Sequence, residues 1–112
     1  MIKITFLEEE GKVVSIKAQG HALFAPKGQD IVCSAVSAIL VGGCNALKNH
    51  KNYEITIDDG YLSIETNGNL TKNDEIVMHT IIIQLMTIQA SYGSFISISK
   101  KCRKEDVYVF KF

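Results

Sequence analysis

The sequence has little of several features that mark common protein classes. Its 112 residues include one proline, no tryptophan and three cysteines, and twelve basic residues balance twelve acidic ones. A formal net charge of zero gives no reason to expect tight binding to the phosphate backbone of a nucleic acid. A single proline and the lack of low-complexity segments argue against a linker, so we expect one domain over residues 1–112.

Long apolar runs are also missing. No stretch approaches the roughly 18 apolar residues of a membrane span, and the N-terminal segment turns acidic at Glu8, unlike a signal peptide. The cysteines are odd in number, with no C-x-x-C pair and no dense spacing, which argues for reduced thiols. We therefore predict a cytoplasmic protein without membrane contact. The histidines and cysteines do not match structural zinc spacings, so we expect no metal and no other cofactor.

Hydrophobic periodicity predicts an α+β fold with the element order ββαββαββ. The predicted strands are Ile2–Leu7, Val13–Gln19, Tyr53–Ile57, Tyr61–Thr66, Phe95–Ser99 and Val107–Phe112. One predicted helix runs from about Ile31 to Lys48, and a second from a cap at Thr71 or Asn73 to about Tyr92. We expect a single two-layer domain of two β-hairpin-plus-helix units, with the helices packed on a mixed or antiparallel sheet.

Several local features refine this prediction. Asp58-Asp59-Gly60 is most simply a hairpin turn, and the basic run Lys100–Lys104 is better explained as a solvated loop than as a specific RNA contact. Gly42 and Gly43 weaken the first helix, which indicates close approach by a partner element. Both helices are apolar enough to expose a patch if one sheet covered them, so we expect a homodimer.

The most informative segment places a cysteine at the start of the first helix. Asp30 is a preferred N-cap residue, so Cys33 falls at the third helical position, near the positive end of the helix dipole. Such a position, or a neighbouring imidazolium, favours a thiolate. His21 ends a strand, and the loop that follows is long enough to return its ring to Cys33. The residues alone leave open a second reading, in which Cys33 merely packs.

Cys44 is not a good partner for Cys33. It lies on nearly the same helix face but roughly 16 Å further along, at about 1.5 Å per residue, which is too far for a disulfide within the helix. We predict that Cys44 belongs to the core.

The segment Gly20–Ser37 resembles a known family. Gly20-His21-Ala22 is followed by G-Q-D-I-V-C-S-A-V-S from Gly28 to Ser37, and this matches the pattern G-H-A…G-x-D-I-V-C-[AS]-A-V-S of the ribosomal-processing cysteine protease family, Prp. Chain length and element order fit the family over the whole sequence. One departure is Leu23, where many members carry glycine, and Pro26 also stiffens a loop that the family uses as a mobile flap.

The resemblance implies a function. His21 and Cys33 carry over as the catalytic pair of a cysteine endopeptidase, which removes a short N-terminal extension from ribosomal large-subunit protein L-twenty-seven by cutting after a pair of phenylalanines. The family also points to a homodimer. An aromatic substrate predicts an apolar subsite, for which Leu23 and Phe24 are candidates, although both residues could equally anchor the loop to the core.

Further roles follow from this mechanism. The backbone N–H groups of Cys33 and Ser34 are candidates to hold the oxyanion, because a helix N-terminus presents unpaired donors. Asp30 either caps the helix or orients His21, and capping fits its residue type and position directly. Ser37, one turn beyond Cys33, is a candidate for the substrate groove.

Two other functions remain open. The first is a small dimeric adaptor that docks on a ribosomal protein and uses Cys33 only for packing. The second is a redox or acyl-transfer enzyme that uses the same thiolate but does not cleave peptides.

Overall fold

The computed structural model describes residues 1–67, 69–102 and 107–110, with the backbone alone for 102 and 107–110. Its elements are β1 (Ile2–Glu9), β2 (Lys12–Gln19), α1 (Ile31–Ala46), the short 3-10 helix η1 (His50–Asn52), β3 (Tyr53–Asp58), β4 (Tyr61–Thr66), α2 (Lys72–Tyr92), β5 (Ile96–Cys102) and β6 (Val107–Phe110). Apart from η1, the predicted order is confirmed.

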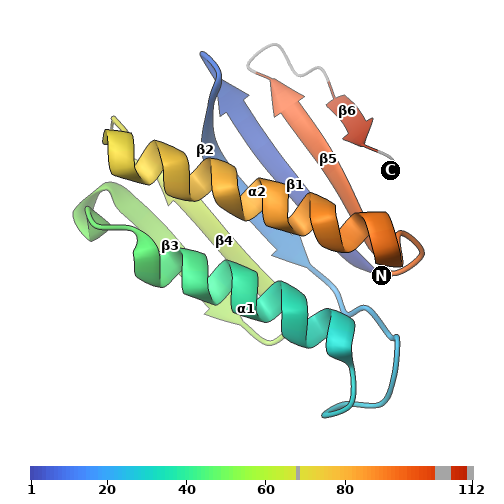
Figure 1. The fold of residues 1–112 in the computed structure, drawn as a ribbon. Coiled ribbons are helices and arrows are strands. Elements are labelled where there is room, and N and C mark those ends of the chain that lie inside the picture. The colour runs from blue at the N-terminus through green and yellow to red at the C-terminus, as the bar shows by residue number, and fades with distance from the viewer. Residues whose placement is uncertain (68, 103–106, 111–112) are drawn as a thin grey trace.

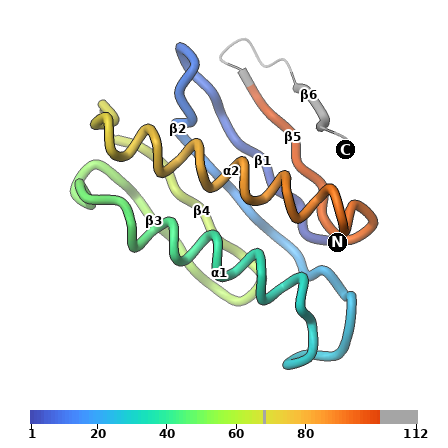
Figure 2. Tube along the Cα trace, in the orientation of Figure 1, coloured from blue at the N-terminus to red at the C-terminus, as the bar shows by residue number. Residues whose placement is uncertain are grey.

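The strands form one mixed sheet in the order β3-β4-β2-β1-β5-β6. The neighbouring strands pair antiparallel except for β1 and β5, which are parallel, with Ile2 opposite Ile96. Figure 1 shows both helices on one face of this sheet, and Figure 2 traces the same arrangement. The predicted two-layer α+β class is confirmed. The parallel pair exists because α2 carries the chain back across the sheet between β4 and β5.

The core fills the space between the helices and the sheet. Its most buried side chains include Ile4, Ile16, Ile64 and Ile98 from the strands and Val32, Met78 and Leu85 from the helices. Cys44 belongs to this core, as predicted, and burial raises the pKa of its thiol. Gly43 explains how the helices meet: a Cβ there would overlap the side chain of Ile81 on α2, whereas Gly42 has no such neighbour within 4 Å.

The C-terminal end of α1 meets the start of α2 through a buried carboxylate. Asp74 has no exposed surface and accepts hydrogen bonds from the N–H groups of Lys48 and Asn49 and from the Tyr53 hydroxyl, at 3.1, 3.4 and 2.9 Å. Thr71 is the N-cap of α2 and accepts from the Asp74 N–H at 3.2 Å. The helix α1 therefore ends at Ala46, two residues before the predicted end, because the next residues turn to meet Asp74.

The basic run differs from its prediction as a loop. Lys100 and Lys101 lie in β5, which extends to Cys102 because the chain continues its parallel pairing with β1 as far as Glu8. The Lys100 ammonium lies 3.9 Å from the Glu8 carboxylate. Residues 103–104 of the run, and 111–112 of the last predicted strand, lie outside the described residues.

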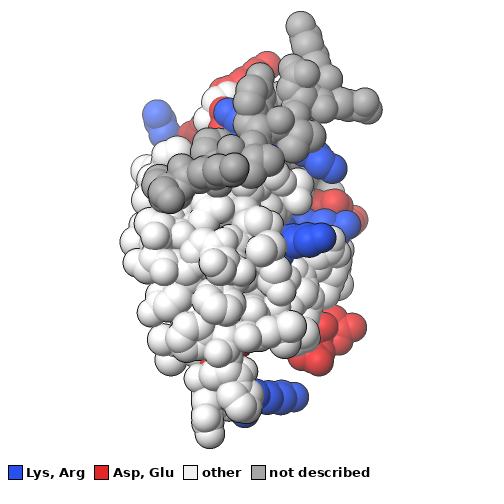
Figure 3. Space-filling model, turned by 90° about the vertical axis from the view of Figure 1, so that its right-hand side faces the viewer, with Lys and Arg blue, Asp and Glu red and all other residues white. Residues whose placement is uncertain are grey.

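Charge is sparse on one side of the molecule. In the view of Figure 3, the charged side chains lie around the margins, and the middle of the face carries none. Within the described residues, no helix is long and apolar enough to cross a membrane.

Candidate active site

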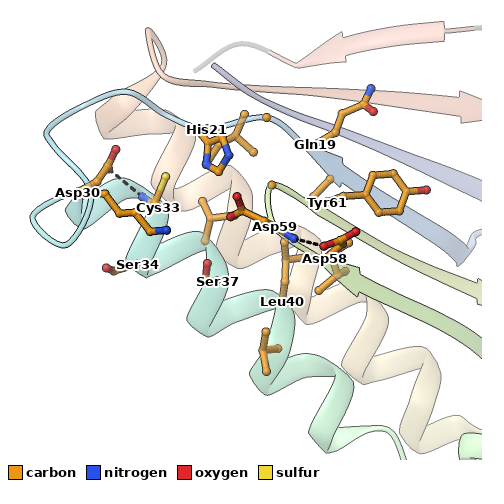
Figure 4. A pocket seen from close by; sticks show the side chains of 18 of the residues that line it. Gln19, His21, Asp30, Cys33, Ser34, Ser37, Leu40, Asp58, Asp59 and Tyr61 are labelled. Carbon is orange, nitrogen blue, oxygen red and sulfur yellow. Dashed lines mark hydrogen bonds between the residues drawn. The ribbon is translucent and has the colours of Figure 1, made fainter.

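A cleft of about 540 Å³ opens between the first half of α1, the end of β2 with the loop after it, and the β3–β4 turn. Its walls include six of the predicted site residues: His21, Leu23, Asp30, Cys33, Ser34 and Ser37. Apolar side chains such as Leu40, Val41 and Ile57 line the rest of the cleft, together with Asp58 and Asp59 of the turn. Figure 4 labels several of these lining residues around the cavity, among them His21, Cys33 and Asp59.

Cys33 is the third residue of α1, as predicted, and its side chain is half-buried. The Ala22 N–H donates to its sulfur at 3.4 Å. Because Ala22 directly follows His21, this contact places the backbone at His21 close to Cys33, as the sequence predicts.

His21 lies at the opposite wall of the cleft, just beyond the end of β2. Its imidazole points toward the Cys33 sulfur in Figure 4. Among the side chains that the structure describes, no hydrogen bond joins the two groups. This does not remove the pair as a candidate, because catalytic hydrogen bonds are often long without substrate and shorten when it binds.

Asp30 is the N-cap of α1 and holds the loop as well. Its Oδ1 accepts from the N–H groups of Val32 and Cys33, each at 3.0 Å, and its Oδ2 accepts from the Phe24 N–H at 3.0 Å. The Cys33 N–H, followed by that of Phe24, keeps the pKa of Asp30 below its usual value against the opposing effect of burial. The carboxylate is therefore ionised near neutral pH and fastens the loop to the helix.

The loop carries two exposed apolar side chains with different surroundings. Leu23 lines the cleft, is 78% exposed and has φ of 58°, a left-handed conformation that glycine adopts at lower cost. Phe24 is not among the residues that line the cleft. Its ring packs edge-on against Tyr92 and Phe95, with centroids 5.6 and 5.1 Å away, so it anchors the loop to the end of α2.

The two N–H groups predicted to hold an oxyanion are engaged in this structure. The Cys33 N–H donates to the Asp30 carboxylate, and the Ser34 N–H donates to the Asp30 carbonyl oxygen at 3.1 Å. The oxyanion role stays a prediction, and it requires these donors to leave Asp30. The Ala22 N–H, which donates to the Cys33 sulfur, is a further donor in this region that no sequence pattern indicated.

The β3–β4 turn is also part of the site. The sequence predicts only a hairpin turn at Asp58-Asp59-Gly60, yet all three residues line the cleft, and Gly60 lies against the His21 ring. No local pattern could have found this, because the turn and His21 are about 40 residues apart and meet through pairing of β2 with β4. Within the described residues, no three His, Cys, Asp or Glu side chains are grouped as metal ligands would be.

Comparisons with known proteins agree on one family. The family model described as "Cysteine protease Prp" matches residues 1–97. The ribosomal processing cysteine protease Prp of Mycoplasma pneumoniae is 35% identical over 111 residues, covering 94% of this chain and all of that protein. The protein of the same name from Staphylococcus aureus is 32% identical over 99 residues, covering 85% of this chain and 93% of that protein.

Solved structures show the same likeness. The crystal structure of an essential ribosomal processing protease Prp from S. aureus, in complex with a covalently linked product peptide, superposes with a TM-score of 0.82 at 30% identity. It covers 90% of this chain and all of the S. aureus chain. A second structure of the S. aureus protease, in complex with a substrate peptide, has a TM-score of 0.71 at 28% identity, with the same coverage.

Proposed function

Because the chain belongs to the cysteine protease Prp family and is a cysteine protease of the ribosomal-processing type, we propose that His21 and Cys33 are its catalytic pair. We also propose that it removes the N-terminal extension of ribosomal large-subunit protein L-twenty-seven. One observation carries the first proposal: His21 and Cys33 stand on facing walls of one cleft, and the residue after His21 donates its N–H to the Cys33 sulfur.

The proposed reaction begins with proton transfer. The His21 imidazole accepts the thiol proton of Cys33, and the thiolate attacks the carbonyl carbon of the scissile peptide bond. The imidazolium then donates this proton to the leaving amine as the C–N bond breaks, which leaves an acyl group on the sulfur. Water attacks this thioester with His21 as general base, and the product acid and the free thiol are released.

Three backbone N–H groups are candidates to hold the oxyanion. Those of Cys33 and Ser34 belong to the helix start and donate to Asp30 in the free protein. That of Ala22 donates to the sulfur. We propose that substrate binding draws donors from this set to the oxyanion, whose full charge makes it a stronger acceptor than a carbonyl oxygen or a thiol sulfur.

The proposed substrate fits the walls of the cleft. Leu23, Val41 and Ile57 are exposed apolar side chains on its rim, and burying them under an aromatic residue is favourable. The S. aureus structures were solved with a substrate peptide and with a covalently linked product peptide, which supports a peptide as the substrate of this fold. We assign Leu23 and Ser37 to the substrate groove and Phe24 to the loop anchor.

Mass spectrometry of a peptide cleavage reaction tests the proposal. The peptide spans the extension and the mature start of the host's own ribosomal protein, and it is incubated with the protein and with Cys33→Ala and His21→Ala. We expect one cut after the aromatic pair, slowed at least about 1,000-fold in both variants because each removes a reacting group. Cys44→Ala is the matched control, since it removes a buried thiol away from the cleft and should leave cleavage intact.

Thiol alkylation separates the other functions if the peptide stays intact. Rapid and selective modification of Cys33 over Cys44 at about pH 6 would then favour a redox or acyl-transfer enzyme that uses the same thiolate. Slow modification would favour an adaptor in which Cys33 packs. Either result would contradict the protease assignment for this substrate.

We also propose a cytoplasmic homodimer. On the outer side of the helix layer, Ile76 and Ile83 of α2 are 65% and 49% exposed, and a groove lies between α2 and the glycines of α1. Burial of such a face between two copies is favourable. Sedimentation equilibrium measures the mass independently of shape, and a monomer at about 100 µM would contradict the proposal.

A further inference from the structure

The His21 ring rests on a glycine of the β3–β4 turn. A Cβ atom built on Gly60 would lie 2.7 Å from Nε2, 3.2 Å from Cε1 and 3.4 Å from Cδ2 of the imidazole. The Gly20 N–H donates to the Gly60 carbonyl oxygen at 2.9 Å, one step beyond the last pair of the β2–β4 ladder. The turn therefore holds both the backbone before His21 and one edge of its ring.

The ring contact is independent of the backbone conformation that a hairpin turn requires. Gly60 has φ of 65°, which a tight turn alone would explain. Gly11, in the β1–β2 turn, has φ of 77°, and an added Cβ there would meet nothing within 4 Å. The two turns thus share a left-handed glycine, and only Gly60 has a ring packed where a side chain would be.

We propose that Gly60 is a positioning residue for the catalytic histidine: its missing side chain leaves the space in which the imidazole of His21 sits facing Cys33. This inference rests on the proposed role of His21. His21 is an exposed residue, and the Gly60 turn lies against one edge of its ring, so the turn restricts the positions that the imidazole can take. Proton transfer depends steeply on such placement, because a shift of about 1 Å can cost about 100-fold in rate.

The matched pair Gly60→Ala and Gly11→Ala tests the proposal. Both variants force an alanine into left-handed φ, so they should lower the melting temperature by similar amounts. Only Gly60→Ala places a methyl group at the ring. We expect kcat for the ribosomal-protein peptide to fall at least tenfold in Gly60→Ala with KM changed less than threefold, and both constants to stay within twofold of wild type in Gly11→Ala.

A readout that needs no substrate accompanies the kinetics. Long-range ¹H–¹⁵N NMR spectra report the two ring nitrogens of each histidine, and His21→Ala identifies the His21 signals. We expect these signals to move in Gly60→Ala and to stay in place in Gly11→Ala. If Gly60→Ala does not fold, the Asn pair Gly60→Asn and Gly11→Asn replaces it, because asparagine tolerates left-handed φ best among side-chain-bearing residues.

The outcomes separate this inference from the function on which it rests. If His21→Ala is inactive while Gly60→Ala matches Gly11→Ala in kcat and in ring signals, the positioning role is overturned and the catalytic pair stands. If His21→Ala cleaves like wild type, the catalytic pair is overturned, and the positioning role falls with it even where the ring signals move.

Discussion

Two buried aspartates lie at the start of the two helices, yet they serve opposite ends of the molecule in different ways. Asp74, in the first turn of α2, has no exposed surface, and Asp30, the N-cap of α1, is 8% exposed. Both carboxylates accept backbone N–H groups, and both have a pKa below the usual value. What differs is the neighbourhood, which is closed around Asp74 and open to a cleft beside Asp30.

The Asp74 network is closed because its partners are buried with it. Burial disfavours its charge, but the Lys48 N–H, the side chains of Asn73 and Tyr53 and the Asn49 N–H outweigh that cost and lower its pKa. Burial, followed by the hydrogen bond and charge of Asp74, raises the pKa of Tyr53 above its usual range. The network joins the end of α1, the start of β3 and the start of α2, so its effect is on stability.

The Asp30 network, in contrast, borders the open cleft. Three backbone N–H groups, from α1 and from the loop, donate to the Asp30 carboxylate. The N–H of Ala22 in the same loop donates to the Cys33 sulfur instead. The same type of interaction therefore joins the helices at one end of the molecule and lies beside the proposed catalytic thiol of Cys33 at the other. The comparison of Asp74 with Asp30 indicates that a buried carboxylate points to a functional site only when a candidate reactive group lies beside it.

The largest expected effect is on stability and comes from removing the Asp74 carboxylate. Asp74→Ala leaves the Tyr53 hydroxyl and two backbone N–H groups without their acceptor, and we expect the free energy of unfolding to fall by about 3–5 kcal/mol. Urea denaturation measures this, and Asp74→Asn, which keeps an acceptor oxygen, should lose less. Cleavage per folded molecule should stay within about twofold of wild type, and a larger loss would show that the two ends are coupled.

Breaking the open network should affect stability and activity together. Asp30→Ala removes the cap and releases the loop, so we expect the melting temperature to fall by roughly 4–8 °C and cleavage to fall at least about tenfold. Asp30→Asn separates the effect of the N-cap from the effect of the negative charge, because asparagine caps a helix as well as aspartate but carries no charge. Stability should largely return in this variant. Full activity in Asp30→Ala would contradict a role in arranging Cys33.

Acid should weaken both ends by the same mechanism. Each carboxyl has a lower pKa in the folded protein than the value of about 3.9 for an unfolded chain. Their stabilisation is therefore complete above about pH 4–5 and is lost as the pH falls through the folded pKa values. Urea midpoints from pH 7 down to pH 3 should show this decline. Asp74→Asn should flatten the curve, and an unchanged slope would contradict the contribution of Asp74.

The smallest effect is expected at the loop that borders the cleft. Leu23→Gly removes the strain of a leucine in left-handed φ, which is worth about 1 kcal/mol. Glycine also raises the conformational entropy of the unfolded chain, at a similar cost in free energy, so stability should change little. Loss of an apolar wall should raise KM a few-fold with kcat nearly constant. Leu23→Asn provides the control, since it tolerates this φ without the apolar surface. An unchanged KM in both variants would remove Leu23 from the substrate groove.

Most elements of the fold and the start of α1 were predictable because they depend on neighbouring residues. Alternation gave the strands, and the N-cap at Asp30 with Cys33 in the first turn follows from the order of residues over one helical turn. The end of α1 was placed two residues too late, and β5 was ended too early at the basic run. Both errors have one cause, because contacts with Asp74 and with β1 override the local preference.

The sequence by itself determined the elements, the cap and the presence of a histidine and a cysteine within a recognisable motif, since all of these depend on residues close together in the chain. Only the tertiary structure decided that Phe24 packs on Tyr92 and Phe95, that β1 pairs with β5 and that Gly60 lies against His21. The residues in these contacts are between 39 positions apart, for His21 and Gly60, and 94 positions apart, for Ile2 and Ile96. No short-range pattern encodes them, because they form only when the sheet and both helices pack around one core.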